Sequence, residues 1–253
     1  MTLRIERRDA LALLRLDKAR GNAIDDAMAA DLGRAAEELS ADDGVRGVLL
    51  ASAHPKLFCP GLDLVSLVGH DRPAMEAFML SFARAVWALY GLRKPVVAAV
   101  NGAAVAGGCI LALTADHRVL RRGAPIGLNE VKVGVPLPWS VTLLLKASVP
   151  APALGRIALL GRNFSDEEAV AVGLAHELCE AEGFEATCLE RLAELADKDP
   201  LALGTTKAWL REGVLREMRA HEATLLGGFL DGWFAPATQQ RLRATVAQLR
   251  SRG

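Results

Sequence analysis

The chain has 253 residues, of which 51% are apolar and 24% charged, and this usage predicts one compact folded unit rather than a disordered chain. Thirty Lys and Arg residues balance thirty Asp and Glu residues. Without a net basic or acidic field, nucleic acid and membrane surfaces are poor candidates for partners.

Short apolar runs alternate with helical patterns along the first half of the chain. The predicted strands cover residues 3–6, 11–16, 45–51, 96–100 and 118–120. The predicted helices between them cover residues 28–39, 72–90 and 107–114. Asp25 or Asp26 is placed to cap the first of these helices. Alternating strands and helices pair in parallel through right-handed crossovers, so we expect an α/β fold.

The second half, after Pro136, is mostly helical in pattern. The predicted helices cover residues 184–196, 201–215 and 238–249. Ser165, followed by acidic residues up to Glu168, predicts a capping box at another helix start. We place a boundary near Pro200, which divides the chain into a core, residues 1–200, and a C-terminal helical region, residues 201–253.

The cysteines and the start of the chain indicate a compartment. No C-x-x-C pair occurs among Cys59, Cys109, Cys179 and Cys188, which favours buried free thiols over a zinc or redox site. The first nine residues carry mixed charge where a secretory signal would need an apolar run. We therefore expect a cytoplasmic protein.

Two glycine-containing loops follow predicted strands. Gly61 lies in the loop of residues 57–64, and Gly107 and Gly108 lie in that of residues 101–110. Such turns can direct backbone N–H groups toward an anion, for which a phosphate and an enolate oxygen are both candidates. The same residues also fit a plain connector, with Asp63 as a helix cap and glycines that allow close packing. Neither loop has the spacing of a nucleotide phosphate loop.

A third loop places Glu130 in an apolar setting between Gly127 and Gly134. A solvated glutamate on an exposed strand edge is the simple interpretation. If Glu130 is buried beside a substrate instead, its proton affinity would rise into the range that suits a general base near neutral pH.

In their order and spacing, these three segments resemble the enoyl-CoA hydratase/isomerase superfamily, the crotonase fold, over the whole chain. The resemblance implies a crotonase-like spiral of ββα units over residues 1–200, which would bind acyl-CoA and carry catalysis. It also implies that residues 201–253 mediate oligomerisation, as a homotrimer or a dimer of trimers.

The resemblance also implies site residues. The backbone N–H groups of Leu62 and Gly107 would bind the thioester oxygen of an acyl-CoA. No metal or separate cofactor is implied, because coenzyme A enters as part of the substrate. It implies that coenzyme A binds along the first loop, at Pro60, Gly61, Asp63 and Leu64. We add two candidates from their positions: Asn129, which either helps orient the site or is a turn residue, and Trp139, which follows the Glu130 loop closely enough to line an acyl pocket.

Ile110 separates the activities within this superfamily. Hydratases place a glutamate at this position and use it with a second one, which matches Glu130. Adding water requires both activation of water and protonation of carbon, whereas moving a proton between two carbons needs one reversible base. The chain is therefore similar to mitochondrial-type Δ3,Δ2-enoyl-CoA isomerases, with Glu130 as the base.

Two departures accompany this similarity: Cys59-Pro60 stands where small residues are usual, and the sequence has no recognisable mitochondrial leader. Two other functions stay open. One is an enoyl-CoA hydratase acting on trans-2-enoyl-CoA, and the other is a non-catalytic acyl-CoA-binding homologue.

Overall fold

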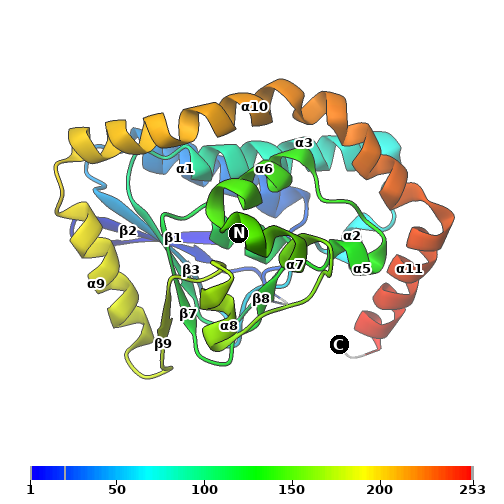
Figure 1. Ribbon diagram of the computed structural model, residues 1–253, viewed down its shortest axis with the longest axis horizontal. Helices are drawn as coiled ribbons and strands as arrows, with labels where there is room; N and C mark the ends of the chain where they lie inside the picture. The colour runs from blue at the N-terminus through cyan, green and yellow to red at the C-terminus, as the bar shows by residue number, and fades with distance from the viewer. Residues whose placement is uncertain (1, 20, 252–253) are drawn as a thin grey trace.

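The larger sheet contains the strands expected from the first half of the chain (Figure 1). A computed structural model, which describes residues 2–19 and 21–251, places six strands in the order β1-β2-β3-β5-β7-β9. These strands are β1 Leu3–Arg8, β2 Leu11–Leu16, β3 Gly47–Ser52, β5 Val96–Val100, β7 His117–Arg121 and β9 Glu177–Cys179. β1 and β2 pair antiparallel, and the other neighbours pair in parallel, which confirms the α/β prediction.

Helices cover both faces of this sheet, which fits the largely apolar sequences of β3 and β5 at its centre. Leu50 of β3 packs into the main core with α1 Asp26–Ala41 and α3 Arg72–Tyr90, whereas Leu49 packs on the other face with residues of α9 Phe184–Ala196. The predicted helices 72–90 and 184–196 match α3 and α9 at both ends. Asp25 is the cap of α1, and its Oδ1 accepts a hydrogen bond from Met28 N at 2.9 Å.

A second, three-stranded sheet was not predicted. It consists of β4 Leu57–Cys59, β6 Ala103–Val105 and β8 Ile126–Gly127, paired in parallel in that order. Strands of two or three residues are too short to show a period of two in the sequence. The remaining helices before residue 180 are α2 Leu64–Leu67, α4 Gly107–Leu113, α5 Glu130–Val133, α6 Trp139–Ser148, the 3-10 helix η1 Ala151–Ala153, α7 Leu154–Ala158 and α8 Asp166–Ala171.

The predicted capping box at Ser165 does not form. Ser165 is the N-cap residue of α8, but its side chain makes no capping hydrogen bond. Asp166 takes a left-handed conformation, with φ 51°, and its Oδ1 accepts from Gly123 N at 2.6 Å. The aspartate next to the expected cap therefore ties this helix start to the loop after β7.

The C-terminal helices are longer than the sequence predicts. α10 is continuous over Pro200–Phe234, where we expected a helix over residues 201–215, and α11 covers Pro236–Arg250. α10 continues past its glycines because one side of it packs against α3 and α6. It ends before Ala235, which has φ −58° and ψ 135°. Ala235 precedes Pro236, and the proline ring disfavours helical geometry in the residue before it. In Figure 1, α10 (orange) runs along the top of the molecule and α11 (red) descends at one end.

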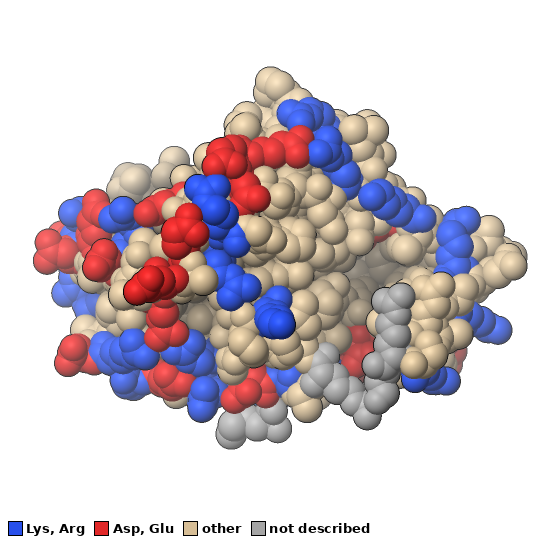
Figure 2. Space-filling view, turned by 90° about the horizontal axis from the view of Figure 1, so that it is seen from below, with Lys and Arg blue, Asp and Glu red and all other residues tan. Residues whose placement is uncertain are grey.

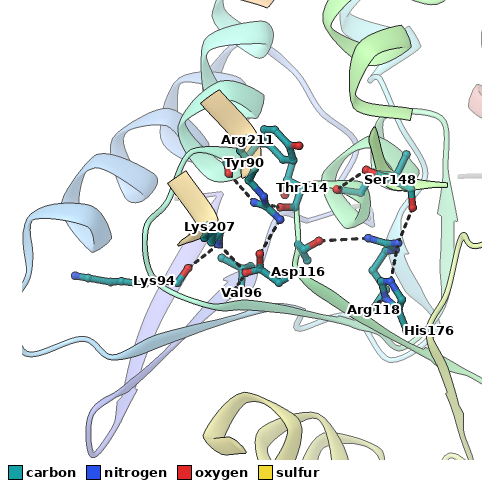
Figure 3. Close-up of polar contacts among 12 residues, drawn as sticks. Tyr90, Lys94, Val96, Thr114, Asp116, Arg118, Ser148, His176, Lys207 and Arg211 are labelled. Atoms are coloured by element: carbon teal, nitrogen blue, oxygen red, sulfur yellow. Dashed lines mark hydrogen bonds and ion pairs between the residues drawn. The ribbon is translucent and has the colours of Figure 1, made fainter. Parts of the chain in front are cut away.

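A charged cluster attaches α10 to the larger sheet (Figure 3). The Asp116 carboxylate accepts from Lys207 Nζ at 2.6 Å and from Arg211 at 2.7 Å, and it also accepts from Val96 N at 2.7 Å. Arg211 also lies over the Tyr90 ring, 4.2 Å from its centroid. Burial lowers the pKa of Lys207 to about 8, and the facing Asp116 charge opposes this shift.

The surface carries charges of both signs. Figure 2 shows basic and acidic side chains interspersed at the end of the molecule where β1, β2 and α9 lie. Surface ion pairs of the protein include Arg8 with Glu185 at 2.7 Å and Arg122 with Glu180 at 2.9 Å. None of the helices in the described ranges is long and apolar enough to cross a membrane.

Candidate active site

The smaller sheet brings the three sequence motifs together. β4, β6 and β8 are parallel neighbours, so the loops that leave their carboxyl ends start at one edge. The loop after Cys59 contains Gly61 and Leu62, the loop after Val105 leads to Gly107, and the loop after Gly127 leads to Glu130. These three loops lie side by side and together form the candidate site. Each motif contributes only part of it.

Gly61 shapes the first loop. Its φ of 101° lies in the region that favours glycine. Ile24 bridges the loop, since its N donates to Gly61 O at 2.9 Å and its O accepts from Asp63 N at 2.8 Å. This bridge does not use the N–H of Leu62, for which the described residues provide no acceptor. The turn thus presents one free amide.

Ala106 shapes the second loop. It has φ 50° and ψ −118°, an uncommon conformation for a residue with a side chain. Its N–H donates to Gly127 O at 2.8 Å, which ties the loop to β8. Gly107 follows as the first residue of α4, and its N–H also lacks an acceptor within the described part of the chain. Free N–H groups at a helix start favour negative charge.

The two loops touch through glycines. A Cβ atom on Gly61 would lie 3.2 Å from Gly107 N, and a Cβ atom on Gly107 would lie 3.2 Å from Gly61 Cα. Such spacing is tighter than ordinary contacts of a Cβ atom, so a side chain on either residue would push the loops apart. Both interpretations of these glycines, close packing and anion binding, are therefore compatible in one structure.

Glu130 is the first residue of α5, a helix of four residues. Its side chain is partly covered, and its Oε2 atom is buried with no hydrogen-bond partner among the residues described. Burial raises the pKa of the Glu130 carboxyl from 4.5 to about 7, although the backbone N–H groups of Glu130 and Asn129 offset part of the shift. A carboxyl group in this state can accept and return a proton near neutral pH.

Helix α4, which begins at the second loop, is buried along its whole length. Ile110, 3% exposed, is part of the main core, as is Cys109. Burial, together with the nearby Glu130 charge, raises the pKa of the Cys109 thiol far above its usual value, so this cysteine stays protonated. In the described chain, no Lys, Arg or His forms a salt bridge with Glu130.

The other predicted substrate-binding residues belong to these loops or follow them along the chain. Pro60 is exposed, and Asp63 caps α2 by accepting from Val65 N at 3.2 Å and Ser66 N at 3.3 Å. Leu64 is the first residue of α2, and Asn129 precedes α5 without a side-chain capping bond. Trp139 begins α6, and its buried Nε1 has no partner among the described residues.

Sequence reasoning missed two contributors to the first loop. Ile24 supplies the bridge that leaves the Leu62 N–H free. Lys18 Nζ lies 2.6 Å from the Asp25 carboxylate and 3.2 Å from that of Asp63, which fixes the loop to the start of α1. Lys18 stands in no motif, so only the folded chain shows its role.

The fold and the arrangement of these loops define a protein of the crotonase fold. The crystal structure of human mitochondrial Δ3,Δ2-enoyl-CoA isomerase superposes with a TM-score of 0.95 at 26% identity, covering 100% of this chain and 99% of that one. An enoyl-CoA hydratase from Mycobacterium marinum gives 0.83 at 26% identity, covering 90% and 100%. The enoyl-CoA hydratase/isomerase family matches residues 6–230, and the chain belongs to this family.

Individual relatives are named for different reactions. Enoyl-CoA delta isomerase 1, mitochondrial, of Homo sapiens is 30% identical over 217 residues, which cover 85% of this chain and 72% of the human protein. Carnitinyl-CoA dehydratase of Escherichia coli K12 is 28% identical over 222 residues, which cover 88% and 84%. The resemblance stated from the sequence is confirmed at the level of the family.

Proposed function

We propose that the protein is a Δ3,Δ2-enoyl-CoA isomerase that shifts the double bond of a 3-enoyl-CoA to give trans-2-enoyl-CoA, a reaction of fatty acid β-oxidation. The observation that carries the proposal is the buried carboxyl oxygen of Glu130, which has no hydrogen-bond partner among the described residues. The chain also has the buried, apolar Ile110 at the position where a hydratase of this family has its other glutamate. The human isomerase, with its TM-score of 0.95, supports the same choice.

The proposed mechanism uses one base and two amides. Glu130 removes a proton from C2 of the substrate, and the electrons of that bond spread over C2, C3, C4 and the thioester oxygen. The N–H groups of Leu62 and Gly107 donate to this oxygen as its negative charge grows. Glu130 then returns the proton to C4, which leaves the double bond between C2 and C3. Each amide donor contributes about 10²–10³ in rate and a well-placed base about 10²–10⁴.

The substrate-binding residues follow from the same proposal. Coenzyme A would lie along the loop of Pro60, Gly61, Asp63 and Leu64, while Asn129 and Trp139 would flank the acyl group. No metal or separate cofactor takes part in these steps.

The test compares wild-type protein with Glu130→Gln. Formation of the conjugated thioester from 3-enoyl-CoA is followed by ultraviolet absorbance, and we expect the variant to lose about 10²–10⁴ in kcat. Glu182→Gln, an exposed glutamate on a loop, is the matched control and should keep wild-type activity. Activity of Glu130→Gln near that of wild type would remove Glu130 from the mechanism.

A hydratase is the second candidate, because carnitinyl-CoA dehydratases are also among the relatives. Incubation of the protein with trans-2-enoyl-CoA separates the two. An isomerase leaves this thioester unchanged, whereas a hydratase converts it to the 3-hydroxyacyl-CoA. Binding of acyl-CoA with neither reaction would identify a non-catalytic homologue.

We also propose that the chain divides into a catalytic core, residues 1–200, and a C-terminal region, residues 201–253. This region would join the protein into a homotrimer or a dimer of trimers. Three large apolar side chains on α10 support this proposal by their exposure, Leu201 at 73%, Trp209 at 73% and Leu210 at 77%. Analytical ultracentrifugation of wild type and Trp209→Glu tests it, with dissociation of the variant as the expected result. The cytoplasmic location stays a prediction.

A further inference from the structure

The segment from Glu130 to Ser140 is held by the two C-terminal helices. Arg241 Nε of α11 donates to Val133 O at 3.0 Å, and Thr238 Oγ1 of α11 donates to Gly134 O at 3.2 Å. At the other end of the segment, Ser140 N donates to the Glu222 carboxylate of α10 at 2.6 Å. Residues more than eighty positions away thus hold the end of α5 and the far end of the segment that starts with Glu130.

The segment needs hydrogen bonds from other elements because its own secondary structure gives it little stability. α5 is a single turn, which is unstable without packing, and it ends at Gly134 with φ 87°. The last carbonyls of a helix have no partner within it, and Arg241 and Thr238 supply hydrogen bonds to this end of α5. Pro136 and Pro138 follow, and neither has an N–H to donate.

The bend between α10 and α11 places the two donors. Ala235 breaks the helix before Pro236, and Gln239 Nε2 closes the bend by donating to Trp233 O at 2.9 Å. Thr238 and Arg241 are three positions apart, so they share a face of α11. This face meets the end of α5 through the two hydrogen bonds. Figure 1 shows α5 and α11 close together at one end of the molecule.

Two close contacts limit the freedom of this arrangement. A Cβ atom on Gly232 of α10 would lie 2.4 Å from Pro136 Cδ, so the helix and the segment are in direct contact. Thr238 is 2% exposed and Glu222 is 1% exposed, so water does not compete for their hydrogen bonds. The Glu222 carboxylate also lies at the N-terminus of α6, where negative charge is favourable and the N-cap residue Pro138 has no side-chain donor or acceptor.

We propose that Thr238, Arg241 and Glu222 are positioning residues that set where the Glu130 carboxyl lies, which makes the C-terminal helices part of the catalytic apparatus. This inference rests on the proposed function, in which Glu130 is the base. The contacts engage backbone groups of the segment and not the carboxyl group itself. They can therefore fix the position of the base without pairing it with a cation.

The test removes one donor hydroxyl and keeps the shape of the side chain. Thr238→Val is compared with Thr238→Ser, which retains the hydroxyl, and with Thr245→Val, the matched control. Thr245 lies on the same helix, but its hydroxyl donates to Arg241 O, within α11. Amide hydrogen exchange over residues 130–140 is measured without substrate, and kcat and KM are measured with a 3-enoyl-CoA.

We expect Thr238→Val to speed amide exchange over this segment about tenfold, the effect of losing one hydrogen bond of typical strength. Its kcat should fall about five- to tenfold with KM within about twofold, because a displaced base impairs the reaction more than binding. Thr238→Ser and Thr245→Val should match wild type in both measurements. If Thr238→Val leaves exchange over residues 130–140 unchanged, or shares its defect with Thr245→Val, the positioning role is wrong.

A second pair of variants covers the case in which Thr238→Val does not fold. Arg241→Met removes the donor to Val133 O from an exposed position, and Arg243→Met, also exposed on α11, is its control. Faster exchange over residues 130–140 in Arg241→Met alone supports the proposal, and equal exchange in both overturns it. Hydrogen exchange needs no turnover, so wild-type protein without isomerase activity would refute the proposed function separately.

Discussion

Gly108 lies directly against the backbone carbonyl of Cys59, and a Cβ atom on Gly108 would come within 2.0 Å of that oxygen. The contact joins the end of β4, after which the Leu62 amide follows, to the start of α4, which contains the Gly107 amide. No rotation of a side chain can relieve it, because the facing atom belongs to the backbone.

Gly108→Ala should therefore push the two loops apart. We expect a loss of about 1–3 kcal/mol in the free energy of unfolding, as for other overpacked sites, and a larger proportional loss of kcat. Gly33→Ala is the control, because a Cβ atom there meets nothing within 4 Å and α1 should gain slightly from alanine. Denaturant unfolding and isomerase assays of both variants check this prediction, and equal stability of the two would contradict it.

The raised pKa of Glu130 makes the activity depend on pH. Only the ionised carboxylate removes a proton, so kcat/KM should fall about tenfold for each pH unit below the pKa. With the pKa at about 7, the fall should begin near neutral pH rather than near 4.5. A pH profile of kcat/KM measures this directly, and a profile that stays flat down to pH 5 would show that Glu130 titrates normally.

The same pKa also has a consequence for stability. The folded protein binds the Glu130 proton more tightly than the unfolded chain does, so stability falls as pH rises from 4.5 to about 7 and is level above it. Glu130→Gln does not titrate, so the variant should gain stability relative to wild type across this range, on the order of 3 kcal/mol in total. Thermal unfolding of both proteins at pH 4.5 and pH 8 tests whether the stability of the variant relative to wild type rises between these pH values.

Asp116 should matter more for stability than the exposed acidic residues. Asp116→Asn leaves Lys207 and Arg211, with 8% and 12% of their side chains exposed, without a neutralising charge. Breaking such a pair costs about 3–5 kcal/mol when it is well buried, so we expect a loss near the lower end of that range. Glu167→Gln, which removes an exposed pair with Arg122, should leave stability close to that of wild type, because solvent screens such pairs. Denaturant titration compares the two variants.

The cysteines should differ in reactivity. Burial raises the pKa of the Cys59 thiol to about 12, and Cys109 and Cys188 are also buried, whereas Cys179 is partly exposed. Iodoacetamide should therefore modify Cys179 of the folded protein first. Mass spectrometry of the labelled protein identifies the site, and early labelling of Cys59 or Cys109 would show that the loops beside the candidate site open.

Local sequence patterns were enough to predict the helices and strands that are long enough to show a repeating apolar pattern. The helical spacing of residues 72–90 and 184–196 is enough to set both ends of α3 and α9. The apolar runs indicated five strands of the larger sheet, whereas β9 was not predicted. Gly61, Gly107 and Glu130 could be selected as candidates because turns, helix starts and an isolated carboxyl group have recognisable local chemistry. Ile110 could be interpreted only through the resemblance to a family.

Tertiary structure alone decided how these candidates meet. Strands of two or three residues carry no readable period, so the sheet of β4, β6 and β8 is evident only from its pairing. The burial of Glu130 depends on neighbours far along the chain, and so does the contact of Thr238 with Gly134. Sequence patterns report the preferences of nearby residues, whereas desolvation and long-range hydrogen bonds depend on which surfaces the folded chain brings together.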